Sequence, residues 1–176
     1  MRAGKCGATR VEFRKAPPEN RVAGLVVFAP PDQAVPVDNQ LRLWTSVKGA
    51  NWRHPTGPDS DLKGKEEYPV VHVAYDDALT YCKWAGKRLP TEAENEFAAR
   101  GGLDRKPYAW GDEFQPGGKW MANTFQGHFP DKNTGADGFT GAAPVACFPA
   151  HRSGLLDRSG HVREWCSSCV RQDYVK

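Results

Sequence analysis

Cysteine and histidine are the residues of this sequence whose spacing first suggests chemistry. Cys166 and Cys169 form a Cys-x-x-Cys pair, and His161 lies a few residues before it. Two such thiolates are half of a zinc site, and His161 would add a third ligand. The sequence has no second Cys-x-x-Cys to complete the site, so free thiols are the simpler alternative. The total of 5 cysteines is odd, which excludes complete internal pairing.

A second spacing, Asp131-x-Asn133-x-Gly135-x-Asp137, resembles the start of an EF-hand calcium loop. An EF-hand needs an oxygen ligand where Gly135 stands and a bidentate Glu where Ala142 stands. The EF-hand interpretation therefore fails. Asn and Asp in such turns ordinarily bond to their own backbone.

The elements that must position these residues are clearest in the middle of the chain. Residues 70–75 are rich in valine and predict a buried strand. A helix is predicted next, with Asp76 or Asp77 as its N-cap and Gly86 at its end.

A second helix is predicted after Pro90. Thr91 and Glu94 have the spacing of a capping box, in which each side chain bonds the backbone N–H of the other residue. The glycine pair Gly101-Gly102 ends this helix. Short strands are predicted at residues 24–30 and 143–147, and the segments between these elements are expected to be irregular.

Composition agrees with an α+β domain that has little regular structure. The chain contains 18 Gly, 14 Pro and 6 Trp, which predicts many turns packed around indole rings. The net charge of +3 is spread along the chain, so we expect no nucleic-acid partner. No apolar run is long enough to span a membrane, and residues 1–10 lack the apolar core of a secretory signal.

Several blocks together resemble the formylglycine-generating enzyme (sulfatase-modifying factor) family. They occur in the family's order over roughly residues 20–165. The blocks are Val47-Lys48-Gly49-Ala50-Asn51-Trp52-Arg53-His54-Pro55, Gly57-Pro58-Asp59-Ser60, residues 68–75, Trp84-Ala85-Gly86-Lys87-Arg88-Leu89-Pro90-Thr91-Glu92-Ala93-Glu94, Ala99-Arg100-Gly101-Gly102-Leu103, Tyr108-Ala109-Trp110-Gly111, Met121-Ala122-Asn123-Thr124-Phe125-Gln126-Gly127, Asp137-Gly138-Phe139, and residues 154–165.

The resemblance implies the family's own fold, an asymmetric α+β domain distantly similar to C-type lectins. It divides the chain into an unmatched segment 1–19, a partial sulfatase-modifying-factor domain 20–165 and an unmatched segment 166–176. We therefore expect an incomplete domain, truncated at both ends.

The family's enzymes are oxidoreductases that convert a cysteine of a sulfatase Cys-x-Pro-x-Arg motif to formylglycine, using oxygen and copper. Two cysteines of a C-terminal segment hold the copper, and soft thiolates suit Cu(I). These 176 residues contain no such segment, and Cys166 and Cys169 do not match the pair. Cys82 matches a family cysteine whose disulfide partner lies in the same segment. The chain alone is therefore predicted to be inactive.

The resemblance also implies two structural calcium sites made of hard oxygen ligands. We name them by their ligands. The first oxygen set comprises the side chains of Asn123 and Asp137 and the carbonyls of Thr124 and Phe139. The second oxygen set comprises the side chains of Asp157 and Glu164 and the carbonyls of Gly160 and Val162.

Some positions depart from the family's pattern. Asn95 stands where the family has a core Trp, which predicts a cavity or a buried polar group costing about 3 kcal/mol. Arg163 replaces a Trp of the peptide groove, and His161 replaces an Asn. Leu43-Trp44 keeps only half of a Trp-Trp pair.

Three functional hypotheses follow. The chain is part of an oxidase, or a non-catalytic calcium-binding interaction protein similar to the family's inactive paralogue, or a pseudogene fragment. The compartment is left open, because animal members of the family lie in the ER lumen and bacterial members are largely cytoplasmic.

Overall fold

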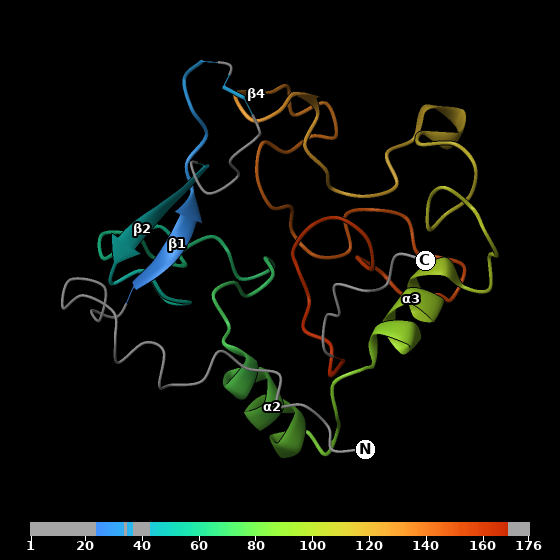
Figure 1. The fold of residues 1–176 in the computed structure, drawn as a ribbon, viewed down its shortest axis with the longest axis horizontal. Coiled ribbons are helices and arrows are strands. Elements are labelled where there is room, and N and C mark those ends of the chain that lie inside the picture. The colour runs from blue at the N-terminus through green and yellow to red at the C-terminus, as the bar shows by residue number, and fades with distance from the viewer. Residues whose placement is uncertain (1–23, 34, 37–42, 169–176) are drawn as a thin grey trace.

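The computed structural model describes residues 24–33, 35–36 and 43–168, and this part of the chain contains few regular elements (Figure 1). Figure 1 shows the paired strands β1 and β2 and the helices α2 and α3, joined by long irregular segments. This agrees with the expected α+β class with little regular structure. The elements are β1 (Gly24–Phe28), β2 (Trp44–Lys48), α2 (Tyr75–Trp84), α3 (Glu92–Arg100), the 3₁₀ turn η3 (Pro116–Gly118), β3 (Gly127–His128) and β4 (Lys132–Asn133).

The strand predicted at residues 24–30 is confirmed as β1, which pairs antiparallel with β2. In this register Phe28 lies opposite Trp44, and their rings meet edge to face at 5.7 Å between centroids. Such pairs stabilise a hairpin beyond the area they bury. Leu43, at the position where the family's pattern has the first Trp of a Trp-Trp pair, is buried just before β2.

The strand predicted at residues 70–75 is wrong. This segment is irregular up to the start of α2, and Val70 is 63% exposed. His72 has a positive φ of 60°, which an extended strand does not allow. Its Nε2 lies 2.8 Å from the carbonyl oxygen of Pro55, so the histidine ring contacts the loop before it.

The strand predicted at residues 143–147 is also wrong. Ala146 has a φ of 62° and its N–H donates to the Asp157 carboxylate at 2.7 Å. Val145 donates to the carbonyl of Glu67 at 2.7 Å. These isolated bonds to different segments replace the regular ladder of a strand.

The first predicted helix is present as α2, but its N-cap is Ala74 and not Asp76 or Asp77. The helix begins earlier than expected, which places Asp77 at the third helical position. There its carboxylate accepts from the N–H of Ala74 at 3.3 Å, so it still serves an unpaired helix donor. Gly86, with φ 65°, follows the end of the helix as predicted.

The second predicted helix is α3, and its capping box is confirmed. Thr91 Oγ1 accepts from the N–H of Glu94 at 3.2 Å, and the Glu94 carboxylate accepts from the N–H of Thr91 at 2.8 Å. Gly101 ends the helix with φ 55°, in the left-handed region that favours glycine.

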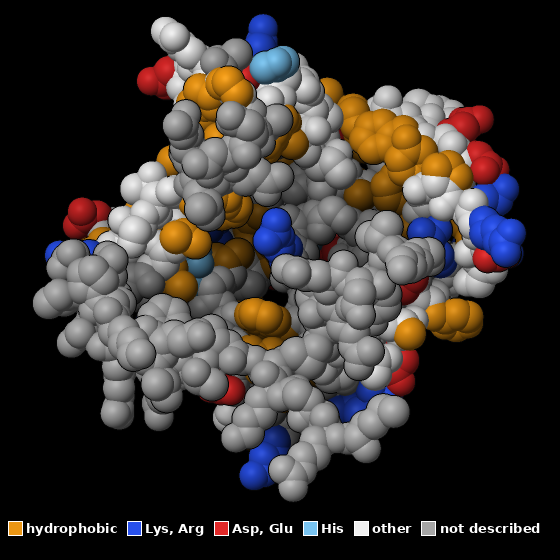
Figure 2. All heavy atoms as spheres, in the orientation of Figure 1, with side chains coloured by type: hydrophobic (Ala, Val, Ile, Leu, Met, Phe, Trp, Pro, Cys, Tyr) orange, Lys and Arg blue, Asp and Glu red, His pale blue; other side chains and the backbone are white. Residues whose placement is uncertain are grey.

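The described core is small, and many apolar side chains are at the surface (Figure 2). Trp84 of α2 is 80% exposed and Phe97 of α3 is 71% exposed. No helix within the described residues has the length and apolarity needed to cross a membrane. The buried hydrophobic residues of the described part are Leu43, Ala50, Leu89, Ala99, Ala122, Ala143 and Phe148.

Candidate metal site

The first oxygen set is brought together by the small hairpin of β3 and β4. These strands pair antiparallel, and the N–H of Thr134 donates to the carbonyl of Gln126 at 2.8 Å. Gly127 allows this close approach, because a Cβ there would lie 2.5 Å from the carbonyl oxygen of Lys132. The chain therefore doubles back and returns Asp137 to the segment that contains Asn123.

The Asp137 carboxylate is the centre of this set. Its Oδ2 accepts from Asn123 Nδ2 at 3.0 Å and from the N–H of Thr124 at 3.1 Å. Its Oδ1 accepts from the N–H of Phe139 at 3.0 Å. The other three residues of the first oxygen set thus contact this carboxylate through N–H donors, and Asn123 is buried.

Gln126 also belongs to this cluster, although the sequence did not single it out as a ligand. Its side chain is buried and its Nε2 donates to both the carbonyl and the hydroxyl oxygen of Thr124. Its Oε1 accepts from the N–H of Asp137 at 3.2 Å. The one signal in the sequence was its place in the block of residues 121–127.

The environment keeps Asp137 ionised. Burial opposes the charge, but hydrogen bonds from Gln126 and from the backbone of Phe139 and Thr124 outweigh it and lower the pKa of the carboxyl. No Lys or Arg of the described residues pairs with this carboxylate. An anionic carboxylate with an amide side chain beside it supplies oxygen donors of the kind that calcium prefers.

The second oxygen set lies in the loop that packs against the first. The N–H of His161 donates to the carbonyl of Asn123 at 2.9 Å, and Gly160, with φ 70°, lies against the same carbonyl. Val162 is half-buried in this loop.

Of the two carboxylates of the second oxygen set, one accepts a backbone N–H and the other pairs with an arginine. Asp157, with φ 54°, accepts from the N–H of Ala146 at 2.7 Å. Glu164 Oε2 pairs with Arg158 Nη1 at 2.6 Å. A cation at this set would therefore have to compete with the Arg158 guanidinium for the Glu164 carboxylate.

Three cysteines of the described residues, Cys82, Cys147 and Cys166, are free and lie on three different segments. Burial, followed by the nearby Glu164 charge, raises the pKa of the Cys166 thiol, which disfavours the thiolate. Cys169 lies outside the described residues, so the structure does not describe the Cys-x-x-Cys pair of the zinc hypothesis. Within ranges 24–33, 35–36 and 43–168, no three or more His, Cys, Asp or Glu side chains gather as metal ligands.

At Asn95 the structure has both features that a small amide in place of an indole predicts, a buried polar group and a hollow. Its Oδ1 is shielded from solvent and has no hydrogen-bond partner among the described residues. The side chain lines a hollow of about 540 Å³ beside α3. The other residues that line the hollow are Lys87, Arg88, Pro90, Glu94, Ala98, Leu155 and Arg158.

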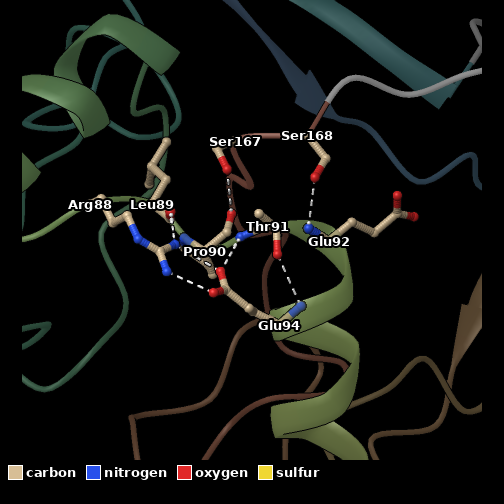
Figure 3. A network of polar contacts seen from close by, with 8 residues as sticks. All are labelled: Arg88, Leu89, Pro90, Thr91, Glu92, Glu94, Ser167 and Ser168. Carbon is tan, nitrogen blue, oxygen red and sulfur yellow. Dashed lines mark hydrogen bonds and ion pairs between the residues drawn. The ribbon is translucent and has the colours of Figure 1, made fainter.

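A polar network fixes the start of α3 (Figure 3). Arg88 binds the Glu94 carboxylate with two hydrogen bonds, of 2.7 and 2.6 Å. Ser168 Oγ accepts from the N–H of Glu92 at 2.9 Å, and Ser167 donates to the carbonyl of Pro90 from its N–H at 2.7 Å. The Arg88 hydrogen bonds, followed by those of Thr91, lower the pKa of Glu94 to about 2.

The fold and the oxygen cluster define a loop-rich α+β domain with a candidate site for a hard cation. The sequence profile of the sulfatase-modifying factor enzyme 1-like domain matches residues 5–176. The chain therefore belongs to the sulfatase-modifying factor family, as the resemblance indicated.

Individual relatives agree with this assignment. The chain is 49% identical over 150 residues to the formylglycine-generating enzyme of Streptomyces coelicolor. The matched region covers 85% of the chain and 48% of that enzyme. It is 55% identical over 124 residues to the formylglycine-generating enzyme of Mus musculus, covering 70% of the chain and 33% of that enzyme. It is also 51% identical over 129 residues to the inactive C-alpha-formylglycine-generating enzyme 2 of Bos taurus, covering 73% of the chain and 42% of that protein. The chain thus spans about half or less of the length of these relatives.

Proposed function

We propose that these 176 residues form the cation-stabilised part of a formylglycine-generating-enzyme domain that acts on sulfatases. The observation that carries the proposal is the identity of 49% to the Streptomyces coelicolor enzyme over 85% of the chain. The substrate is a sulfatase peptide with a Cys-x-Pro-x-Arg motif, and the reaction converts its cysteine to formylglycine.

The oxidation needs more than these residues supply. Copper provides the oxygen chemistry in the family and requires a pair of thiolates. The described thiols lie on separate segments, and the raised pKa of Cys166 disfavours its thiolate. We therefore assign the described thiols no step of the oxidation, and we expect the 176 residues alone to leave the sulfatase cysteine unconverted.

Calcium is the proposed structural ion, bound by the first oxygen set. Convergence of Asn123, Thr124 and Phe139 on the anionic Asp137 supports this assignment. The Nδ2 of Asn123 makes the contact to Asp137, so its amide oxygen is not used there. Calcium prefers such mixtures of carboxylate, amide and carbonyl oxygens. Its role here is to hold the β3–β4 hairpin and the segment before it together.

A second candidate function is supported by a different observation. The relative of Bos taurus that shares 51% identity is named as inactive, so the fold also occurs without the oxidation. In this alternative the domain binds a protein partner and leaves the cysteine unchanged. Binding of the peptide to the chain, with no conversion of its cysteine under any condition, would favour this alternative.

The test incubates the 176-residue chain with a Cys-x-Pro-x-Arg peptide, copper, calcium and oxygen, and follows the peptide by mass spectrometry. We expect the thiol to be retained, because no copper-binding thiolate pair is supplied. The full-length Streptomyces coelicolor enzyme is the positive control, and a peptide with Ser for Cys is the negative control. A formylglycine product from the 176 residues alone would overturn the proposal that these residues take no step in the oxidation.

A further inference from the structure

A fixed positive charge already pairs with one carboxylate of the second oxygen set. Arg158 Nη1 lies 2.6 Å from Glu164 Oε2, and the side chain of Arg158 is only 19% exposed. Its Nε is shielded from solvent and has no hydrogen-bond partner among the described residues. Glu164 is therefore the one counter-charge that the described structure provides for this partly buried guanidinium.

A calcium ion in the same place would compete with this ion pair. Calcium would need the Glu164 carboxylate, and taking it would leave the Arg158 charge partly buried and unpaired, which is strongly unfavourable. The two cations would also repel each other. A guanidinium does not lose its proton in proteins, so pH cannot relieve the competition.

The loop itself is already held without an ion. Asp157 accepts from the N–H of Ala146 at 2.7 Å, and the N–H of His161 donates to the carbonyl of Asn123 at 2.9 Å. The first oxygen set differs, because Asp137 accepts only neutral donors from the described residues. In the second set the charge of Glu164 is thus compensated by an arginine, whereas the charge of Asp137 in the first set has no cationic partner among the described residues.

We propose that Arg158 takes the place of a metal ion in the second oxygen set, so that the chain binds calcium at the first set alone. The proposal rests in part on the calcium site assigned to the first set. It makes Arg158 a positioning residue that links the Asp157 turn to Glu164.

The experiment measures how many calcium ions the folded 176-residue chain binds, by native mass spectrometry and calorimetric titration with calcium chloride. We expect one ion for the native chain, none for Asp137→Asn and two for Arg158→Met. Arg163→Met is the matched control, because Arg163 is an exposed arginine of the same loop, and it should still bind one ion. Far-UV circular dichroism establishes that each variant is folded.

A variant that does not depend on replacing Arg158 is Glu164→Gln. Since Glu164 is no calcium ligand in the native chain, this change should leave the count at one. Loss of an ion in Glu164→Gln, or two ions in the native chain, would overturn the proposal, as would a folded Arg158→Met that gains none. If the native chain binds no calcium but Arg158→Met gains an ion that Glu164→Gln then removes, the role of Arg158 stands and the first-set assignment fails.

Discussion

At the scale of single residues, the partner of each carboxylate decides what that carboxylate can do. Asp137 receives neutral N–H donors and keeps its charge available. Glu164 and Glu94 each receive an arginine and are used to hold the chain. The same side-chain chemistry therefore gives a candidate ion site in one loop and internal ion pairs at two other places, one of them in α3.

The lowered pKa of Glu94 gives stability a defined pH dependence. The folded-state pKa of about 2 lies below the ordinary value of 4.5, so the unfolded chain binds the proton more tightly. The contribution of Glu94 is thus fully present above pH 4.5 and is lost as the pH falls towards 2. Glu94→Gln should lower the melting temperature at pH 6, and its difference from the native chain should shrink over this window. Differential scanning calorimetry across the window measures both effects.

Glu92→Gln is the matched control for this prediction. Glu92 lies in the same first turn of α3, but its contact to Ser168 uses the backbone N–H and not the carboxylate. The pH dependence of Glu92→Gln should therefore follow the native chain. A Glu94→Gln variant whose melting curve parallels the native chain from pH 6 to pH 2 would contradict the assigned role.

At the scale of elements, α3 is held at both of its ends. Its start is held by the capping box and by Ser167 and Ser168, and its end is held by Gly101. A Cβ at Gly101 would also collide with Arg152, so the absence of a side chain serves both conformation and packing.

Replacing Gly101 by alanine should be more destabilising than replacing its neighbour Gly102. Both have positive φ, of 55° and 84°, so alanine at either site costs about 1–2 kcal/mol in conformation. A Cβ at Gly101 would also lie 2.7 Å from the Cβ of Arg152, which adds about 1–3 kcal/mol of overpacking, whereas a Cβ at Gly102 meets nothing within 4 Å. Urea unfolding of the two variants measures the difference. An equal decrease in the free energy of unfolding for both variants would show that Arg152 moves aside without an energetic cost.

At the scale of the whole molecule, the described part has more large apolar side chains at its surface than in its core. The buried apolar residues are few and several are alanines, whereas Trp84 and Phe97 are mostly exposed. Large exposed apolar areas commonly mark surfaces that another segment or protein covers.

These exposed side chains should bind a hydrophobic dye. We expect the folded chain to enhance the fluorescence of anilinonaphthalene sulfonate, and the double variant Trp84→Gln/Phe97→Gln to reduce that enhancement by about half or more, because exposed apolar area carries the binding. Trp52→Gln is the control, since Arg53 already stacks over Trp52 with 3.9 Å between guanidinium and ring centroid. An equal response from the control and the double variant would show that α2 and α3 are not the dye-binding surface.

Local signals in the sequence predicted local structure well. Thr91 and Glu94 fixed the start of α3 because a capping box involves neighbours only. The strand predicted at residues 70–75 failed because the conformation of His72 depends on Pro55, a contact that no local pattern contains. The partners of Arg158 and the role of Gln126 were missed for the same reason, since loop closure by tertiary contacts sets them. The family resemblance supplied the residues of the first oxygen set, and the β3–β4 hairpin explains why they converge.

The bond between Ser168 and the start of α3 has a consequence for the order in which the chain folds during synthesis. The hydroxyl that accepts from the N–H of Glu92 lies 76 residues later in the chain. At translation rates of ~5–20 residues per second, the ribosome needs ~4–15 s to supply it after Glu92. The Thr91–Glu94 capping box can form soon after α3 is made, whereas the hydrogen bond from Glu92 to Ser168 forms only after Ser168 has been made. The nascent helix is therefore held by neighbours in the sequence before the late-made segment secures it.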